Sequence, residues 1–213
     1  MATATLSTRA SALAPHRFTA AEYYRMVEAG ILGEDDRVEL LGGQIVDMSP
    51  INPPHAATVD RSVRVFTRAV GDRALIRNQN PLDLGEYDAP EPDLALVQPR
   101  ADEYAEAHPT AAAVLLLVEV ADSSLVYDRH VKLPLYAAAG VREAWILNLQ
   151  ERRLEVSQEP REDGYAVTRV YRASERLAPL VFPELDIAVA DLLPPGAVER
   201  ARAAEHQREP GRQ

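Results

Sequence analysis

The stretch VLLLVEVADSSLVYDRHVKLPLYAAAGVREAWILN, residues 114–148, decides the fold of this chain. It opens with the continuous apolar run 114–121, which is typical of a strand covered on both faces. A helical pattern over 127–141 ends at Gly140, and EAWILNL, residues 143–149, is a second buried strand. A strand, a helix and a strand in this order call for a right-handed crossover and a parallel pair of strands.

The segments before this unit alternate between helical and strand patterns. FTAAEYYRMVEAG, residues 18–30, is a helix that opens with a capping box of Thr19 and Glu22. RVELLGGQIVDM, residues 37–48, has two short β-runs around a Gly-Gly pair and predicts a hairpin. NPPHAATVDRSVRVFTRAVG, residues 52–71, is an amphipathic helix. Its apolar stripe consists of Val59, Val63, Phe66 and Val70.

The remaining segments predict strands and one long loop. ALIRNQ (74–79) and DLALVQ (93–98) read as strands, and residues 99–113 as a loop with one helical turn. RRLEVSQ (152–158) and GYAVTRVY (164–171) read as antiparallel strands. Together with a looser segment over residues 179–194, these patterns indicate an α/β fold. We expect a central mixed β-sheet flanked by helices, with additional antiparallel hairpins.

Composition sets the boundaries of the domain and its class. We expect a disordered leader over residues 1–17, a single domain over 18–194 and a disordered or marginally helical tail over 195–213. The chain has no cysteine, which excludes disulfides and thiol catalysis. No apolar run approaches the roughly 20 residues of a membrane span, so we expect a cytoplasmic protein. The net charge of −10 disfavours nucleic-acid binding overall, although it does not exclude a local basic patch.

Lys132 is the only lysine in the chain, although Lys and Arg together number 23. Arginine therefore serves wherever only a positive charge is needed. Lysine differs from arginine because it is a compact ammonium whose pKa responds to burial. The position of Lys132 between the two predicted buried strands therefore suggests a chemical role, with chance placement as the alternative.

Two carboxylates interrupt apolar strands. Glu119 stands near the end of the run 114–121, where a buried charge is costly unless it is compensated. Asp93 follows Pro92 at the mouth of another apolar strand. A strand that ends before Glu119 and an ordinary turn aspartate are the structural alternatives. Because ligand sites in α/β sheets form at strand ends, the pair is also a candidate Mg²⁺ site.

Six segments of the chain resemble the Uma-type putative restriction endonuclease family, within the PD-(D/E)XK nuclease superfamily. The matching segments run in order from about residue 18 to 193: FTAAEYYRM, RVELLGGQIVDMSP, PPHAATVDRSV, EPDLALV, LLLVEVADSS and YDRHVKLPLYAAAGVREAWILNL. The resemblance implies a restriction-endonuclease-like fold. It also implies a Mg²⁺-dependent DNA endonuclease, with Mn²⁺ as a possible substitute.

The resemblance assigns roles to particular residues. Asp93 and Glu119 match the metal-binding acids, and the backbone carbonyl of Val120 is expected to join them. Many relatives place the catalytic lysine two residues after the glutamate, where this chain has Ala121. In the Uma-type pattern the lysine lies on the following helix, which assigns Lys132. A further acidic position matches Glu39, which could equally be an exposed hairpin residue.

Asp128, Lys132 and Tyr136 are spaced four residues apart and share one side of the predicted helix. We expect Asp128 and Tyr136 to orient Lys132. We expect the apolar stripe of Val131, Leu135 and Ala138 on the neighbouring side to face the sheet. A surface Asp-Lys pair is the alternative. Pro134 inside this helix predicts a kink.

Three more residues are candidates for substrate contact. His55 opens the amphipathic helix and matches a family position, where it would touch substrate or cap the helix. Arg61 and Arg64, on the side of this helix opposite its apolar stripe, would contact phosphates in a nuclease, although solvated arginines are the default.

The sequence leaves three functions open. The first is a Mg²⁺-dependent endonuclease, for which a homodimer is the simplest way to cut both strands of DNA. The second is a non-catalytic interaction module that keeps the nuclease fold. The third, a carboxylate glycosidase, has little support because only 6 % of residues are aromatic.

Overall fold

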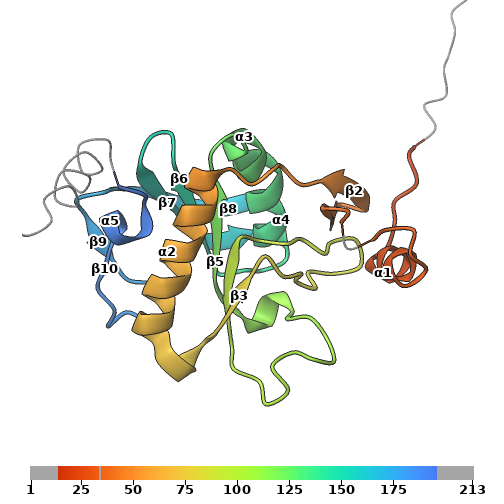
Figure 1. The fold of residues 1–213 in the computed structure, drawn as a ribbon, viewed down its shortest axis with the longest axis horizontal. Coiled ribbons are helices and arrows are strands. Elements are labelled where there is room, and N and C mark those ends of the chain that lie inside the picture. The colour runs from red at the N-terminus through yellow and green to blue at the C-terminus, as the bar shows by residue number, and fades with distance from the viewer. Residues whose placement is uncertain (1–13, 34, 196–213) are drawn as a thin grey trace, which may run out of the picture.

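A six-stranded mixed sheet forms the centre of the computed structural model, which describes residues 14–33 and 35–195 (Figure 1). Its order is β3-β4-β5-β6-β7-β8. The strands are β3 (Leu75–Asn78), β4 (Leu94–Val97), β5 (Val114–Ala121), β6 (Glu143–Asn148), β7 (Arg153–Arg161) and β8 (Gly164–Arg172). β5 and β6 pair in parallel, while every other neighbouring pair is antiparallel. The parallel pair expected from residues 114–148 is confirmed. Residues 1–13 and 196–213, most of the predicted leader and tail, lie outside the described residues.

The two faces of the sheet carry separate apolar cores. Helices α2 (Pro53–Val70) and α5 (Val189–Leu192) cover one face, and α4 (Leu133–Ala138) covers the other. Alternate residues of β5 serve each face, so Val118 packs towards α2 and Leu117 towards α4. This double coverage explains why β5 is apolar along most of its length.

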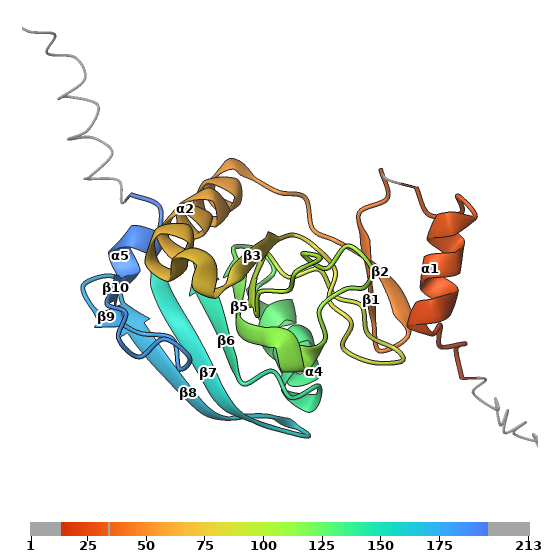
Figure 2. The ribbon, with the colours of Figure 1, turned by 90° about the horizontal axis from the view of Figure 1, so that it is seen from below.

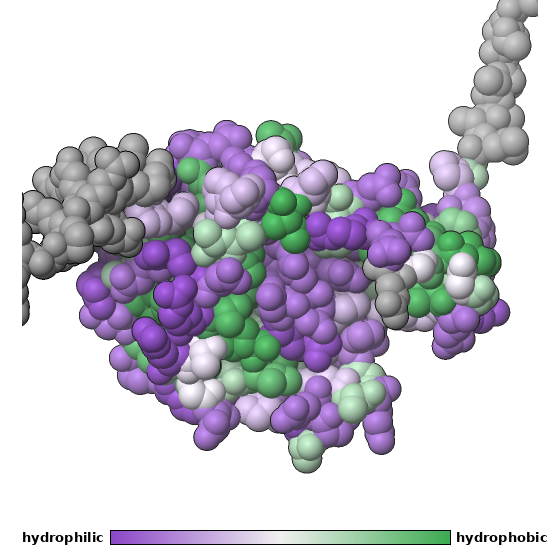
Figure 3. Space-filling model, in the orientation of Figure 1, coloured by the Kyte–Doolittle hydropathy of each residue, from purple (hydrophilic) through white to green (hydrophobic). Residues whose placement is uncertain are grey.

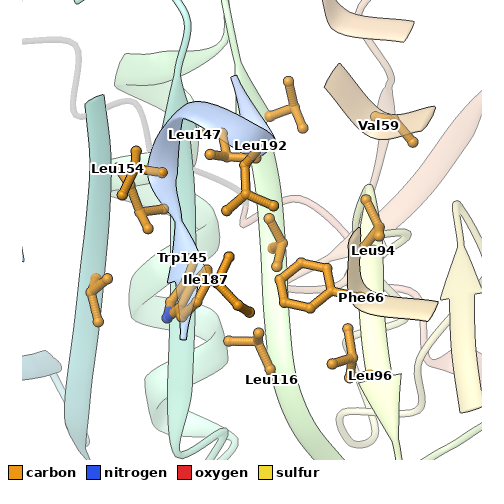
Figure 4. Packing of buried hydrophobic residues seen from close by; sticks show 14 of the residues in the cluster. Val59, Phe66, Leu94, Leu96, Leu116, Trp145, Leu147, Leu154, Ile187 and Leu192 are labelled. Atoms are coloured by element: carbon orange, nitrogen blue, oxygen red, sulfur yellow. The ribbon is translucent and has the colours of Figure 1, made fainter. Parts of the chain in front are cut away.

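The larger core contains the predicted stripe of α2. Val59, Phe66 and Val70 are buried, and Val63 packs against them. Figure 4 shows Phe66 beside Trp145 of β6. The centroids of their rings lie 5.9 Å apart. The expectation that Trp145 is a core residue is confirmed, because its side chain is fully buried.

A smaller unit precedes the sheet in the chain and lies beside it (Figure 2). It consists of α1 (Ala20–Glu28) and the hairpin of β1 (Val38–Leu41) and β2 (Gln44–Asp47). The capping box is present, since Thr19 and Glu22 bond each other's backbone N–H groups. Backbone hydrogen bonds in both directions between Leu40 and Ala89 tie the hairpin to the segment before β4. This attachment carries Glu39 to the end of the sheet.

Short elements complete the described chain. They are η1 (Gly71–Arg73), η2 (Ala111–Ala113) and the paired β9 (Arg176–Leu177) and β10 (Ile187–Ala188). η2 is the helical turn expected in the loop over residues 99–113. Among the described helices, none is both long enough and apolar enough to cross a membrane.

The helix expected over 127–141 forms in three segments. They are α3 (Leu125–Tyr127), the π-turn η3 (Asp128–Lys132) and α4. The predicted orientation of this helix is wrong for Val131 and Ala138, whereas Leu135 packs against the core as expected. Val131 is 39 % exposed and Ala138 is also exposed, whereas the polar residues at 128, 132 and 136 are buried. Lys132 and Tyr136 face inward because the carboxylates of Glu39 and Glu119 satisfy them, and Asp128 accepts a hydrogen bond from the Ser124 hydroxyl.

Candidate active site

A pocket of about 280 Å³ lies where the β1–β2 hairpin meets the ends of β4 and β5. Six of the predicted site residues line it: Glu39, His55, Asp93, Glu119, Asp128 and Lys132. They come from β1, the first turn of α2, the start of β4, the end of β5 and η3. The fold therefore brings together residues that lie more than ninety positions apart in the chain.

Asp93 is held by groups from three elements. Its Oδ1 lies 2.8 Å from His55 Nε2 and 3.3 Å from the side-chain nitrogen Nε2 of Gln79. Its Oδ2 accepts the backbone N–H of Val120 at 2.8 Å. Burial alone would raise the pKa of Asp93, but the hydrogen bond and charge of His55, with the Val120 N–H, hold it below its ordinary value. Asp93 is therefore a carboxylate at neutral pH.

Pro92 explains why Val120 has its backbone available for this site. Leu94 of β4 pairs with Val118 of β5, and the same antiparallel register continued by two residues would place Pro92 opposite Val120. Proline has no N–H to donate to the Val120 carbonyl. The N–H and C=O of one strand residue point to the same side, so the carbonyl of Val120 lies on the same side of β5 as the N–H that Asp93 accepts.

Glu119 is buried on the face of the sheet that α4 covers. Its Oε1 accepts the hydroxyl of Tyr136 at 2.5 Å, and its Oε2 accepts the backbone N–H of Asp93 at 3.3 Å. Burial raises the pKa of Glu119 to about 8, and the charges of Asp93 and Asp128 add to this rise, whereas Lys132 and the Tyr136 hydroxyl oppose it. A cation that joined this carboxylate would displace its proton.

Lys132 bridges two buried acids. Its Nζ lies 3.1 Å from Glu39 Oε1 and 3.4 Å from Glu119 Oε1, and the side chain is 8 % exposed. Burial would lower the pKa of Lys132, but the charges of Glu119, Glu39 and Asp128 raise it above its ordinary value. The side chain is therefore an ammonium at neutral pH. Glu39 is itself fixed, because its Oε2 accepts the backbone N–H of Glu91 at 3.1 Å.

The pocket holds more acids than bases. Asp47 and Glu91 line it beside the four predicted acids, whereas its lysine and arginine side chains are Lys132 and the exposed Arg37. Burial is the main cause that raises the pKa of Asp128, to about 6, and also that of Glu91. A further positive charge would stabilise this arrangement.

The oxygen ligands of this pocket suit Mg²⁺ better than a metal ion that needs all of its ligands from the protein. Within residues 14–33 and 35–195, no group of three or more His, Asp or Glu side chains is arranged to hold an ion alone. Asp93 and Glu119 nevertheless lie adjacent, since Glu119 Oε2 accepts the backbone N–H of Asp93, and Val120 adds a backbone carbonyl on the side of β5 that faces Asp93. Mg²⁺ keeps several waters and takes only one or two carboxylates from the protein. The residues present therefore fit this ion.

Other predicted residues lie outside the pocket. Tyr136 is fully buried behind Glu119 and contacts its carboxylate rather than Lys132. Arg61 and Arg64 line a separate groove with Arg68 and Asp191 between α2 and α5. Figure 3 shows strongly hydrophilic side chains over this part of the surface.

Gln79 is a pocket residue that the sequence analysis did not identify. It follows β3, and its backbone φ of 50° turns the chain towards Asp93. The polar run NQN after an apolar strand was the available signal, but it is also typical of an ordinary turn.

The sheet order, its single parallel pair and the helix between those two strands define a restriction-endonuclease-like α/β protein. The chain belongs to the Uma2 family, described as "Putative restriction endonuclease", whose model matches residues 20–190. It is also similar to a crystal structure from Anabaena variabilis described as a putative nuclease belonging to DUF820. That likeness has a TM-score of 0.64 at 19 % identity and covers 82 % of this chain and 97 % of that one. No curated protein matches the chain.

Proposed function

We propose that this protein is a Mg²⁺-dependent DNA endonuclease that hydrolyses phosphodiester bonds, with Mn²⁺ as a substitute. The single observation that carries the proposal is the meeting of Asp93, Glu119 and the only lysine of the chain in one pocket. Membership of a family described as putative restriction endonuclease supports the same function.

Asp93, Glu119 and the Val120 carbonyl would hold the Mg²⁺, which supplies a Lewis acid for the phosphate and lowers the pKa of a bound water. Asp93 is ionised already and presents both oxygens near the strand ends. Glu119, whose pKa is raised to about 8, would release its proton to solvent on becoming a ligand. His55 and Gln79 fix the rotamer of Asp93, and Tyr136 fixes that of Glu119.

Lys132 acts as a hydrogen-bond donor in this proposal. Because neighbouring carboxylates raise its pKa, its ammonium does not accept a proton from water at neutral pH. It can instead orient the attacking water and stabilise the negative charge that develops on the phosphate oxygens. Glu39 holds the Nζ in place from the hairpin side. The broad fork of arginine would not fit between two acids at 3.1 and 3.4 Å in the same way.

Plasmid cleavage tests the proposal. Supercoiled and single-stranded DNA would be incubated with the purified protein and Mg²⁺ or Mn²⁺, beside Asp93→Ala and Lys132→Arg. We expect metal-dependent nicking by the natural protein and loss of nicking in both variants. Cleavage that survives both substitutions would exclude the mechanism. A homodimer, if it forms, would convert nicks into double-strand breaks and would sediment at twice the mass of one chain.

A non-catalytic interaction module is the second candidate. It is favoured by the observation that both oxygens of Asp93 and both oxygens of Glu119 already accept hydrogen bonds within the protein. An acidic pocket also repels DNA phosphates unless a cation is present. No cleavage together with no binding of Mn²⁺ in a calorimetric titration would select this candidate.

A further inference from the structure

The helix that carries Lys132 contains one widened turn. In η3 the backbone N–H of Leu133 donates to the carbonyl of Asp128, five residues back rather than the usual four. Such single π-turns are rare in proteins, but those that occur are often found at functional sites. Asp128 and Lys132 stand at the two ends of η3, and both are buried, at 3 % and 7 % exposure.

Pro134, two residues after η3, explains why the π-turn forms. Pro134 follows Leu133 in the first turn of α4. An α-helical turn here would require the residue at 134 to donate an N–H to the carbonyl of His130. Proline has no N–H, and its ring collides with the carbonyl four residues back. A turn that takes one additional residue removes both conflicts, and the helix continues after it.

The widened turn changes which side chains face the sheet. In a regular α-helix, residues four apart drift by about 40° around the axis, so Asp128, Lys132 and Tyr136 would spread over about 80°. One turn with an additional residue cancels much of this drift. All three side chains are buried in the structure, whereas Val131 is exposed. Lys132 reaches Glu39 and Glu119 as a result, and Tyr136 reaches Glu119.

We propose that Pro134 is a positioning residue, which enforces the π-turn and thereby directs the Lys132 ammonium at Glu39 and Glu119. The geometric part of this proposal is independent of the reaction. Its consequence for catalysis rests on the proposed endonuclease function. Pro134→Ala restores the N–H, so the helix can close an α-turn and rotate Lys132 away from the two acids.

The single lysine makes the geometry directly observable. Labelling with [¹⁵N]lysine gives one side-chain ammonium signal, which belongs to Lys132 without further assignment. A buried, hydrogen-bonded ammonium exchanges slowly with water, so we expect a persistent signal in the natural protein at neutral pH. In Pro134→Ala we expect exchange at least about tenfold faster, because the ammonium moves into solvent. An unchanged signal in Pro134→Ala would overturn the proposal.

Leu133→Ala is the matched control. It removes side-chain packing beside the same turn without adding an N–H, and we expect the lysine signal to persist. Loss of the signal in Leu133→Ala as well would overturn the specific role of the proline, because any disturbance of the helix would then suffice.

Cleavage kinetics test the catalytic consequence separately. We expect the single-turnover rate of Pro134→Ala to fall about 100-fold, as for a misplaced catalytic group, with DNA affinity maintained. We also expect a lower thermal midpoint, because Glu39 and Glu119 lose the ammonium beside them. A displaced lysine with undiminished cleavage would overturn the positioning role. If the natural protein does not cleave DNA, the proposed function fails, and the lysine signal alone still decides whether Pro134 positions Lys132.

Discussion

Replacing Lys132 by methionine removes the charge that compensates two buried carboxylates while keeping a chain of similar length. The side chains of Glu39 and Glu119 are only 3 % and 4 % exposed, and they lie 3.1 and 3.4 Å from the Nζ. At an effective dielectric constant near 20, each contact corresponds to a gross attraction of about 5 kcal/mol. Much of this offsets desolvation. Breaking a buried pair from one side costs about 3–5 kcal/mol net, which is the destabilisation that we expect above pH 8, where Glu119 is ionised in the natural protein.

The destabilisation should depend on pH. The pKa of Glu119 is raised to about 8, above its value in the unfolded chain, so its contribution to stability is present at low pH and is lost as pH rises through 8. Lys132 lowers this raised pKa, so its removal would raise the pKa of Glu119 further, and a proton can replace the lost cation up to about pH 8. The difference between Lys132→Met and the natural protein should therefore be smaller below pH 8 and should grow above it.

Urea denaturation followed by tryptophan fluorescence measures this difference, because Trp145 is the only tryptophan and is fully buried. Arg25→Met is the matched control. Its ion pair with Glu22 spans 3.9 Å and the arginine side chain is 72 % exposed, so its loss should leave the urea midpoint nearly unchanged. A loss below about 1 kcal/mol in Lys132→Met above pH 8, or one that does not change with pH, would refute the buried pairing.

Three further predictions follow from individual contacts. Affinity for Mn²⁺, measured by calorimetry, should rise about tenfold per pH unit up to pH 8 and should level off above it. The reason is that Mn²⁺ binding releases the proton of Glu119, whose pKa is raised to about 8. An affinity that does not change between pH 6 and 8 would contradict the role of Glu119. Tyr136→Phe should lower the free energy of unfolding by about 1–3 kcal/mol, since Glu119 Oε1 loses a buried donor, and an unchanged urea midpoint would show that the bond contributes nothing. Phe66→Ala should cost about 3–5 kcal/mol because it empties the fully buried space between α2 and Trp145; a thermal midpoint within one degree of the natural protein would contradict the packing.

Most of the sheet could be predicted because its signals are local. The apolar run 114–121 and the second run after Gly140 are long and periodic, and the crossover rule then leaves one arrangement for β5 and β6. Asp93 and Glu119 could be identified because a charge inside an apolar strand is costly and therefore conspicuous. The placement of β4 beside β5, by contrast, depends on pairing across the long loop over residues 99–113, which no local pattern specifies.

The orientation of the lysine helix could not be read from the sequence. A regular 3.6-residue period places Val131 and Ala138 near the sheet, but the π-turn before Pro134 rotates the polar side chains inward. Pro134 predicts that the helix is disturbed, but the sequence does not show whether the result is a kink or a widened turn. The contact between Gln79 and Asp93 could not be predicted from the sequence either, because it depends on the pairing of β3 with β4.

The central claim is that Asp93 and Glu119 share one divalent cation beside Lys132. Anomalous diffraction from crystals soaked in Mn²⁺ measures this directly. We predict one anomalous peak within about 2.5 Å of a carboxylate oxygen of each residue, with the Val120 carbonyl as a further ligand. A pocket without a peak at saturating Mn²⁺, or a peak that does not contact Asp93, would contradict the claim.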